Sequence, residues 1–256
     1  MIHSSAIIDP AAQIGSNVSI GAFSIVGADV SIGDNSWIGP HVVISGHTRI
    51  GRENKIFQFS SIGEAPQDLK YNGEPTLLEI GDRNVIRENT TFHRGTVGGL
   101  GKTSIGNDNL FMAYTHVAHD CVIGDHVILA NAASLAGHVE VGDYAILGGF
   151  TLVHQFTRIG QHSFCGLGTV VTQDITPFAT VAGNRARAAG INKEGLKRRG
   201  FSAQLIRALH KTFRKMVKSR QSREDALLDI QPLRDEYPEV EHLVQFILNS
   251  KRGITR

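Results

Sequence analysis

The chain has 256 residues, of which 41% are apolar, and its 26 Lys and Arg against 24 Asp and Glu leave a formal net charge of +2. This length allows a substantial core in one or two domains, and the balanced charge excludes a chain that is basic or acidic throughout. Two cysteines, Cys121 and Cys165, form no CxxC pair, so we expect small core residues in a reducing compartment. No segment approaches the ~20 apolar residues of a membrane span, and the amino-terminal residues lack a signal-peptide pattern. We therefore expect a cytoplasmic protein without membrane insertion.

From the beginning of the chain, an aliphatic residue recurs at every sixth position. The first series reads Ile8, Ile14, Ile20, Val26, Ile32, Ile38, Ile44, Ile50, Ile56 and Ile62. After an interruption the series continues in phase to Phe92, shifts by one position, and runs on from Ile105 to Val171. A helix would repeat apolar residues near every 3.6 positions and a flat strand every second position. The period of six instead predicts an all-β parallel β-helix built from hexapeptide repeats.

Glycine often follows the aliphatic residue, as at Gly15, Gly21, Gly33 and Gly106. We interpret these glycines as corners at which the chain needs freedom in φ. The hexads resemble those of the hexapeptide-repeat acyltransferases. That resemblance implies three hexads in each triangular coil of 18 residues, a left-handed parallel β-helix, and trimers with clefts between neighbouring prisms. A β-helix that serves only as a scaffold for a partner stays open as an alternative.

Two segments interrupt the repeat. Residues 64–77, with the sequence EAPQDLKYNGEPTL, lack the glycine pattern and are interpreted as an excursion loop that leaves the coil. Residues 95–102 contain four glycines and are interpreted as a mobile loop. Loops that project from a rigid scaffold are favoured places for function.

After Val171 the repeat ends, and the composition changes toward helix formers and basic residues. We divide the chain into a β-helix at 1–190 and a small C-terminal α-helical domain at 191–256. Between Arg185 and Arg223 there are thirteen Lys or Arg and one acidic residue. Such a run is often only a solvated helix face, but its asymmetry indicates an acidic partner.

Capping residues predict where the helices of the C-terminal domain begin. Ser202 is a predicted N-cap for a helix from Ala203 to about Ser219. Ser222 with Asp225 predicts the start of the next helix. The residues that are expected to interrupt the remainder are Pro232 and Pro238.

Four histidines gather in successive coils: His116, His119, His138 and His154. Because His119, Gly137 and Gln155 are 18 positions apart, we expect them to stack on one edge of the prism. One chemistry for this column is a zinc site, which needs three neutral imidazoles within ~2.1 Å of the ion and occurs in hexapeptide-repeat carbonic anhydrases. The other is general-base catalysis, since an imidazole with a pKa near ~6.5 removes a hydroxyl proton near neutral pH. No GxSxG motif or plausible cysteine nucleophile is present, which favours direct transfer over a covalent intermediate.

Six stretches resemble the UDP-N-acetylglucosamine O-acyltransferases of the lipid A pathway, along essentially the whole chain: QDLKYNGEPT, FHRGT, HVAHDC, LAGH, HQF and NKEGLKRRGF. The resemblance implies transfer of a (R)-3-hydroxyacyl group from acyl carrier protein to the 3-hydroxyl of UDP-N-acetylglucosamine, by a homotrimer that needs no cofactor, metal or nucleic acid. It implies His119 as the base and the amide of Gly137 as a donor to the developing oxyanion. It assigns the other substrate contacts to Gln67, Asp68, Lys70, His116, His138, His154, Gln155, Asn192, Glu194, Arg198 and Arg199.

One position departs from this family's pattern. In the stretch HSFCGLG the family can carry glycine at the place of Leu167, a position that limits the length of the acyl chain. Leu167 occupies the same place in its hexad as His119 but lies on another edge, so in a trimer it would close the neighbouring cleft. We therefore expect Leu167 to shorten the accepted chain. The N-acyltransferase of the same pathway is a weaker alternative, because it normally has a further N-terminal uridine-binding domain, whereas here the hexads begin by Ile8.

Overall fold

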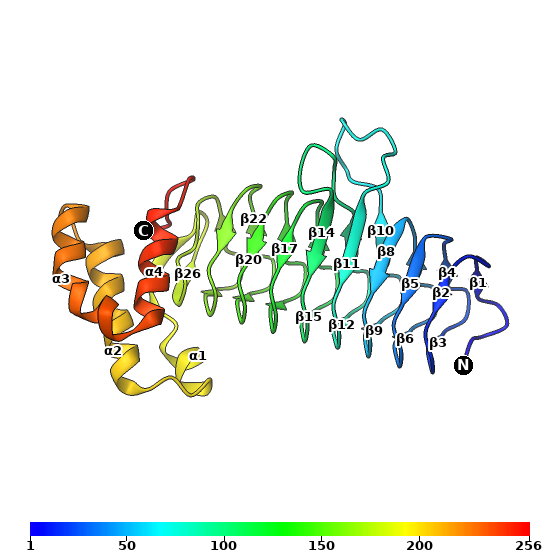
Figure 1. Ribbon diagram of the computed structural model, residues 1–256, viewed down its shortest axis with the longest axis horizontal. Coiled ribbons are helices and arrows are strands. Elements are labelled where there is room, and N and C mark those ends of the chain that lie inside the picture. Colours follow the sequence, from blue (N-terminus) through cyan, green and yellow to red (C-terminus); the bar gives the residue numbers. More distant parts are fainter.

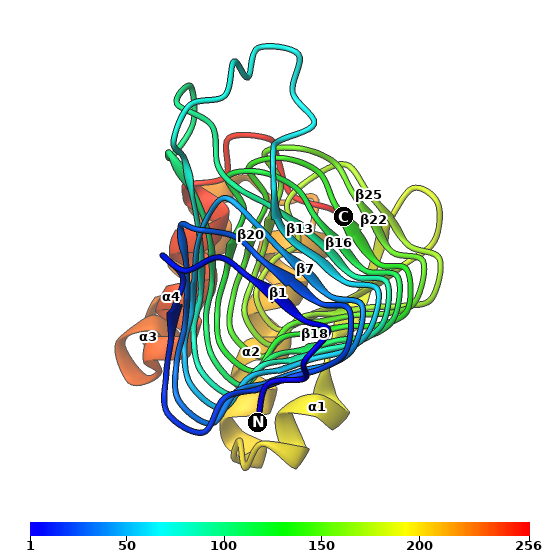
Figure 2. The same ribbon diagram turned by 90° about the vertical axis from the view of Figure 1, so that its right-hand side faces the viewer.

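The protein is an elongated triangular prism of three parallel sheets with helices packed at one end (Figure 1; Figure 2). The structure, a computed structural model, describes residues 1–256. Consecutive strands enter different sheets, and every third strand returns beside the one three places earlier. This topology is a parallel β-helix followed by a helical region, so the predicted fold class is confirmed.

The three sheets are named by their number of strands. The nine-stranded sheet contains β1 (Ile7–Ile8), β4 (Ile25–Val26), β7 (Val43–Ile44), β10 (Ser61–Glu64), β13 (Thr91–His93), β16 (His116–Val117), β19 (Ser134–Leu135), β22 (Leu152–Val153) and β25 (Val170–Val171). The eight-stranded sheet contains β2 (Gln13–Ile14), β5 (Val30–Ile32), β8 (His47–Ile50), β11 (Leu77–Ile80), β14 (Lys102–Ile105), β17 (Val122–Ile123), β20 (Glu140–Val141) and β23 (Arg158–Ile159). The ten-stranded sheet contains β3 (Ser19–Ile20), β6 (Trp37–Ile38), β9 (Lys55–Ile56), β12 (Val85–Ile86), β15 (Leu110–Phe111), β18 (Ile128–Leu129), β21 (Ile146–Leu147), β24 (Phe164–Cys165), β26 (Ala179–Ala182) and β27 (Arg187–Ile191).

The register of the strands confirms a coil of 18 residues. Ile8 pairs with Val26, and Val26 pairs with Ile44. Two coils are longer because the excursion loop leaves between β10 and β11 and the glycine-rich loop between β13 and β14; both project from the same end of the prism cross-section (Figure 2). The residues of the six-residue series fill the interior, where most are fully buried. Both cysteines are free and buried, and burial raises the pKa of each thiol to about 12, which confirms them as core residues.

The interpretation of the glycines as corners with special φ was wrong. None of the predicted corner glycines has a positive φ; the left-handed residue comes three positions after the aliphatic one and is usually not glycine, as at Asn17, Phe23 and His126. The glycines are needed for another reason. A Cβ at Gly21 would lie 2.5 Å from Pro40 N in the next coil, and a Cβ at Gly33 would lie 2.6 Å from the carbonyl carbon of Gly51. Glycine here permits close stacking of the coils.

Five helical segments follow β27, beginning with α1 (Lys193–Arg198). The others are α2 (Ala203–Phe213), the π-helix η1 (Arg214–Lys218), α3 (Arg223–Glu236) and α4 (Pro238–Leu248). The Ser202 and Ser222 caps are confirmed, since their hydroxyls accept from Leu205 N and Asp225 N. Two details were wrong: the predicted helix to Ser219 changes to π geometry after Phe213, and Pro232 lies inside α3. No helix combines the length and apolar character needed to cross a bilayer.

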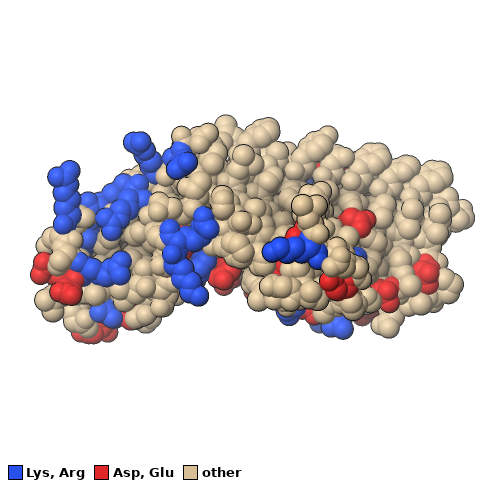
Figure 3. Space-filling view, turned by 90° about the horizontal axis from the view of Figure 1, so that it is seen from above, with Lys and Arg blue, Asp and Glu red and all other residues tan.

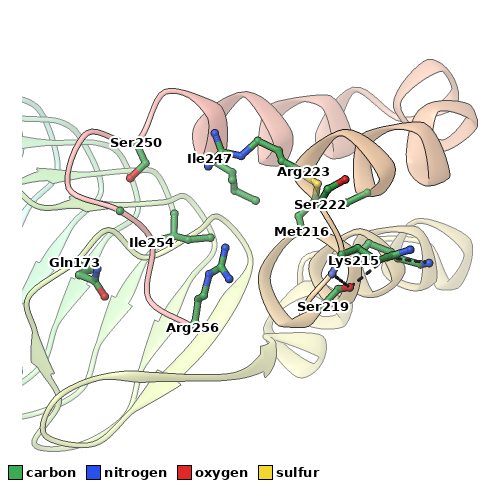
Figure 4. A pocket seen from close by; sticks show the side chains of 13 residues that line it. Gln173, Lys215, Met216, Ser219, Ser222, Arg223, Ile247, Ser250, Ile254 and Arg256 are labelled. Carbon is green, nitrogen blue, oxygen red and sulfur yellow. Dashed lines mark hydrogen bonds between the residues drawn. The ribbon is translucent and has the colours of Figure 1, made fainter.

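The last residues of the chain return to the prism. Thr255 N donates to Asp174 O at 2.8 Å, and Ser250 Oγ donates to the Asp174 carboxylate at 2.7 Å. Between this tail, η1 and the start of α3 lies a cavity of about 330 Å³, lined by Lys215, Met216 and Arg223 among others (Figure 4). None of the predicted site residues lines it. One apolar core continues from the prism into the helices.

Candidate active site

One edge of the prism carries the predicted histidine column. This edge, between the nine-stranded and eight-stranded sheets, contains the turns at His119 and Asp120, at Gly137 and His138, and at Gln155 and Phe156; we call it the His119 edge. A Cβ on Gly137 would lie 2.6 Å from His119 Cε1 and 2.7 Å from His119 Nε2. The predicted stacking of Gly137 on His119 is therefore confirmed, and only glycine lets the imidazole lie so close.

A buried carboxylate orients His119. His119 Nδ1 lies 2.8 Å from Asp120 Oδ2, and the Asp120 side chain has no exposed surface. Burial raises the pKa of the Asp120 carboxyl, but hydrogen bonds from His119, Thr96 and Leu100 outweigh burial and hold that pKa below its ordinary value. An ionised carboxylate can only accept, so Nδ1 of His119 carries the proton and Nε2 keeps a free lone pair.

The neighbouring imidazoles are held in their neutral form. His138 stands edge-to-face to His119, with ring centroids 5.1 Å apart, and stacks on Phe156 at 4.4 Å. Burial lowers the pKa of His138. His116 Nδ1 lies 2.7 Å from Thr91 Oγ1, and burial followed by the proximity of His119 lowers its pKa. His93, which the motif analysis did not single out, packs against His116, and burial lowers its pKa to about 4.

A cleft of about 540 Å³ opens beside this edge on the nine-stranded sheet. The predicted residues that line it are Gln67, His116, His119, Gly137, His154 and Gln155. The amide N–H of Gly137 makes no hydrogen bond within the chain. The cleft thus brings a base with a free nitrogen lone pair and an uncommitted amide donor to one place.

The excursion loop bends over this cleft. Asp68 lies near enough to His138 to favour its charged form, although burial still dominates. Arg94 fixes the loop from below: Nη1 donates to Gly63 O at 2.7 Å and Nη2 donates to Tyr71 Oη at 2.8 Å. From the other side, Arg252 of the carboxyl-terminal tail reaches His154, with Nη2 3.3 Å from Nδ1.

The zinc alternative can be tested on the donor set. His119, Asp120 and His138 have possible ligand atoms within 4.8 Å of one another. However, both oxygens of Asp120 already accept hydrogen bonds from Thr96 and Leu100 as well as from His119. A metal would have to displace these bonds, so the cluster is organised as a hydrogen-bonded His–Asp pair.

Two family models match the chain. One, described as UDP N-acetylglucosamine O-acyltransferase, domain 2, matches residues 174–255, and one for bacterial transferase hexapeptide repeats matches residues 102–137. The acyl-[acyl-carrier-protein]–UDP-N-acetylglucosamine O-acyltransferase of Janthinobacterium sp. (strain Marseille) is 54% identical over 260 residues, which cover 100% of this chain and 99% of that protein. The chain belongs to the UDP-N-acetylglucosamine O-acyltransferase family.

Other members of this acyltransferase family agree. The same-named protein of Pseudomonas putida (strain W619) is 53% identical over 251 residues, covering 98% of this chain and 97% of its own. The LpxA structure from Acinetobacter baumannii superposes with a TM-score of 0.96 at 45% identity, covering 100% of this chain and 99% of that chain. The Arabidopsis UDP-N-acetylglucosamine acyltransferase superposes with a TM-score of 0.85 at 36% identity and full coverage of both chains. The resemblance carried by the six motifs is confirmed, and the protein is an acyltransferase rather than a scaffold.

Within one acyltransferase chain, several predicted site residues lie away from the cleft. Lys70 is exposed on the excursion loop, and Leu167, 77% exposed, lies on the edge between the ten-stranded and nine-stranded sheets. Asn192 caps α1 and donates to His162 O at 3.1 Å, while the guanidinium of Arg199 lies 4.7 Å from the ring centre of Tyr144, on the third edge. The remaining two, on α1, are Glu194 and Arg198.

Sequence reasoning also missed residues that this acyltransferase uses to build its site. Thr96 and Leu100 bind Asp120, and Arg94 binds the excursion loop. Counting in steps of 18 fails here because the two loops lengthen their coils: β13 pairs with β16 through Phe92 and Val117, which are 25 positions apart. The sequence FHRGT marked this segment, but only the strand register shows that it lies beside the histidine column.

Proposed function

We propose that the protein transfers a (R)-3-hydroxyacyl group from acyl carrier protein to the 3-hydroxyl of UDP-N-acetylglucosamine, the first step of lipid A biosynthesis. His119 Nε2 removes the proton of the sugar 3-hydroxyl as its oxygen attacks the thioester carbonyl carbon. The Gly137 amide donates to the oxygen of the tetrahedral intermediate. Collapse of the intermediate breaks the carbon–sulfur bond, and the carrier thiol leaves with the proton from His119.

The observation that carries this proposal is the contact between the His119–Asp120 pair and Gly137. A general base must lie within hydrogen-bond reach of its proton and keep its lone pair free. Asp120 holds Nδ1, so that Nε2 is free. Gly137 packs against the same ring and lines the same cleft. Both cysteines are buried, which supports direct transfer without an acyl-cysteine intermediate.

A homotrimer completes the proposed site. Exposed apolar side chains follow the nine-stranded sheet and the edge that joins it to the ten-stranded sheet, and a soluble monomer rarely exposes so long an apolar strip. They include Ile7, Ile25, Phe23, Phe59, Tyr114, Phe150 and Leu152. In the proposed trimer this strip is covered by neighbouring subunits. Asn192, Glu194, Arg198 and Arg199 then contact the nucleotide at a cleft shared between chains, with Lys70 at the sugar or the pantetheine.

The acyl carrier protein is proposed to dock on the helical end. Lys and Arg gather there, whereas the opposite end of the same face carries few (Figure 3). A cleft on α2 and η1 has no apolar lining and is bounded by Arg207, His210, Lys211, Arg214, Lys215 and Lys218. An acidic carrier protein fits this surface by charge, and steering by such a patch weakens with added salt.

The test uses chelator-treated protein with UDP-N-acetylglucosamine and a panel of acyl carrier proteins that bear 3-hydroxyacyl or plain acyl chains of different length. We expect acylated sugar nucleotide, detected by mass, with the 3-hydroxyacyl donors only. The 3-deoxy analogue of the acceptor should give no product. Absence of product with every donor would contradict the proposed reaction, and product with the 3-deoxy analogue would contradict the acceptor position.

A further inference from the structure

The glycine-rich loop at 95–101 is folded around the carboxylate of Asp120. Thr96 N donates to Asp120 Oδ1 at 3.1 Å and to Oδ2 at 3.2 Å, and Thr96 Oγ1 donates to Oδ2 at 2.7 Å. Leu100 N donates to Oδ1 at 2.8 Å. The loop predicted to be mobile is therefore attached near both of its ends to the residue that orients His119.

The composition of the loop fits this wrapping. Gly99 N and Gly101 N both donate to Thr96 O, at 3.1 Å and 3.0 Å, which closes a tight turn. A Cβ on Gly99 would lie 2.5 Å from the carboxyl carbon of Asp120. A side chain at Gly99 would therefore push the loop off the carboxylate, whereas Val97 and Leu100 turn their side chains to solvent. The glycines serve close approach to Asp120 rather than flexibility.

Thr96 shares an oxygen with the catalytic base. Asp120 Oδ2 accepts from Thr96 Oγ1 at 2.7 Å and from His119 Nδ1 at 2.8 Å. Thr96 is only 7% exposed and Asp120 only 1%, so water does not replace these bonds freely. Two donors on one oxygen and two on the other fix both the position and the plane of the carboxylate, and through it the plane of the imidazole.

We propose that Thr96 is a positioning residue for His119: its hydroxyl and amide hold Asp120 as an oriented carboxylate, which in turn keeps the His119 lone pair on Nε2, toward the cleft. This inference rests on the proposed role of His119 as the base. Without the Thr96 hydroxyl, Asp120 can turn about its Cβ–Cγ bond, and the imidazole is no longer held in one orientation or one tautomer.

The deciding variants are Thr96→Val, which loses only the hydroxyl, and Thr96→Ser, which restores it. We expect Thr96→Val to lower kcat about 10- to 100-fold, the range for a lost hydrogen bond to a charged group, with KM for both substrates little changed. Thr96→Ser should recover kcat to within about threefold of wild type, because the hydroxyl-to-carboxylate bond is restored. The acidic limb of the pH–rate profile of Thr96→Val should move to higher pH, because a carboxylate with one donor fewer holds the imidazolium proton more tightly.

The matched control is Thr157→Val. Thr157 is fully buried in the same prism, and its hydroxyl has no hydrogen-bond partner, so its loss should leave kcat and the pH profile unchanged. A Thr96→Val enzyme with wild-type kcat and pH profile overturns the proposal. So does an equal loss in Thr96→Ser and Thr96→Val, since this would reflect packing rather than the hydroxyl.

A measurement without turnover separates this inference from the reaction itself. In ¹⁵N-labelled protein, the His119 ring signals, identified by their absence in His119→Ala, should show the Nδ1–H tautomer in wild type and a mixture in Thr96→Val. If no donor yields product but the tautomer shifts as expected, the proposed function fails and the positioning role stands. An unchanged tautomer in Thr96→Val overturns the positioning role even when the wild type is active.

Discussion

Two edges of the prism carry histidine columns in the same coils, and only one of them forms a cleft beside a His–Asp pair. The second column, which we call the Tyr144 edge, lies between the eight-stranded and ten-stranded sheets and consists of His126, Tyr144, His162 and Phe178. Its rings stack face to face, with centroids 4.6, 4.8 and 5.7 Å apart. On the His119 edge the rings of His119 and His138 instead stand at 89° to each other.

The backbone amides of the turns show a second difference. On the Tyr144 edge, a side chain one coil on caps the turn amide: Arg52 N donates to Asp82, Asn107 N to Asp125, and Asp125 N to Asp143. On the His119 edge the residue one coil beyond Gly137 is Gln155, and the Gly137 amide has no partner within the chain. A column of imidazoles is therefore compatible with plain structure; a carboxylate behind one ring and an uncapped amide beside it distinguish the site.

The largest expected effect comes from removing one histidine from each column. His119→Ala should lower kcat about 10²- to 10⁴-fold, the range for loss of a general base, because no other imidazole has its Nδ1 at 2.8 Å from Asp120. His126→Ala, at the exposed start of the Tyr144 stack, should retain activity close to wild type. Steady-state rates with the best donor measure both. Equal losses in the two variants would contradict the assignment of the base.

The second effect tests the uncapped amide by making the His119 edge resemble the other one. Gln155→Asp puts a carboxylate one coil beyond Gly137, as Asp143 lies one coil beyond Asp125, where it accepts the amide at 2.9 Å. Because the amide is then occupied, kcat should fall about 10²- to 10³-fold, the cost of one lost oxyanion donor. Gln155→Ala removes the same side chain without capping, and its kcat should fall less than about tenfold. Similar rates for the two variants would show that Gly137 N–H is not the donor.

How far the sequence led can be judged from particular residues. The period of six predicted the sheets and the core because each hexad places one aliphatic side chain in the interior, as at Ile38 and Ile62. The step of 18 placed Gly137 on His119. It did not predict the contact of Thr96 with Asp120, because a loop of variable length separates them in register, and it did not reveal what the glycines do. Close approach between coils is a property of packing, and a φ argument alone did not anticipate it.

A third prediction concerns the remaining edge, between the ten-stranded and nine-stranded sheets, where Leu167 is exposed. If this leucine closes a neighbouring cleft in a trimer, Leu167→Gly should favour longer acyl chains. A donor two carbons longer should gain about tenfold in kcat/KM, at ~0.8 kcal/mol for each buried methylene. Leu167→Ala should give an intermediate shift, and Leu228→Ala, exposed on α3, should give none. An unchanged chain-length profile in Leu167→Gly would falsify the role of this leucine.

The smallest expected effect is a change in stability rather than in rate, and it concerns the Tyr144 edge. Burial, followed by the charge of Arg199, lowers the pKa of His162 from 6.5 to about 4. Between these values the unfolded chain binds a proton that the folded chain does not, so the free energy of unfolding falls as the pH drops from about 6.5 toward about 4. His162→Phe keeps the stack with Tyr144 and Phe178 but cannot be protonated, so its melting temperature should fall less between pH 7 and pH 5 than that of wild type. Thermal unfolding over this range measures the difference, with His126→Phe at the exposed end of the same stack as the control. Equal slopes for wild type and His162→Phe would mean that His162 is already protonated in the fold, and the Tyr144 edge would then be more than a neutral aromatic stack.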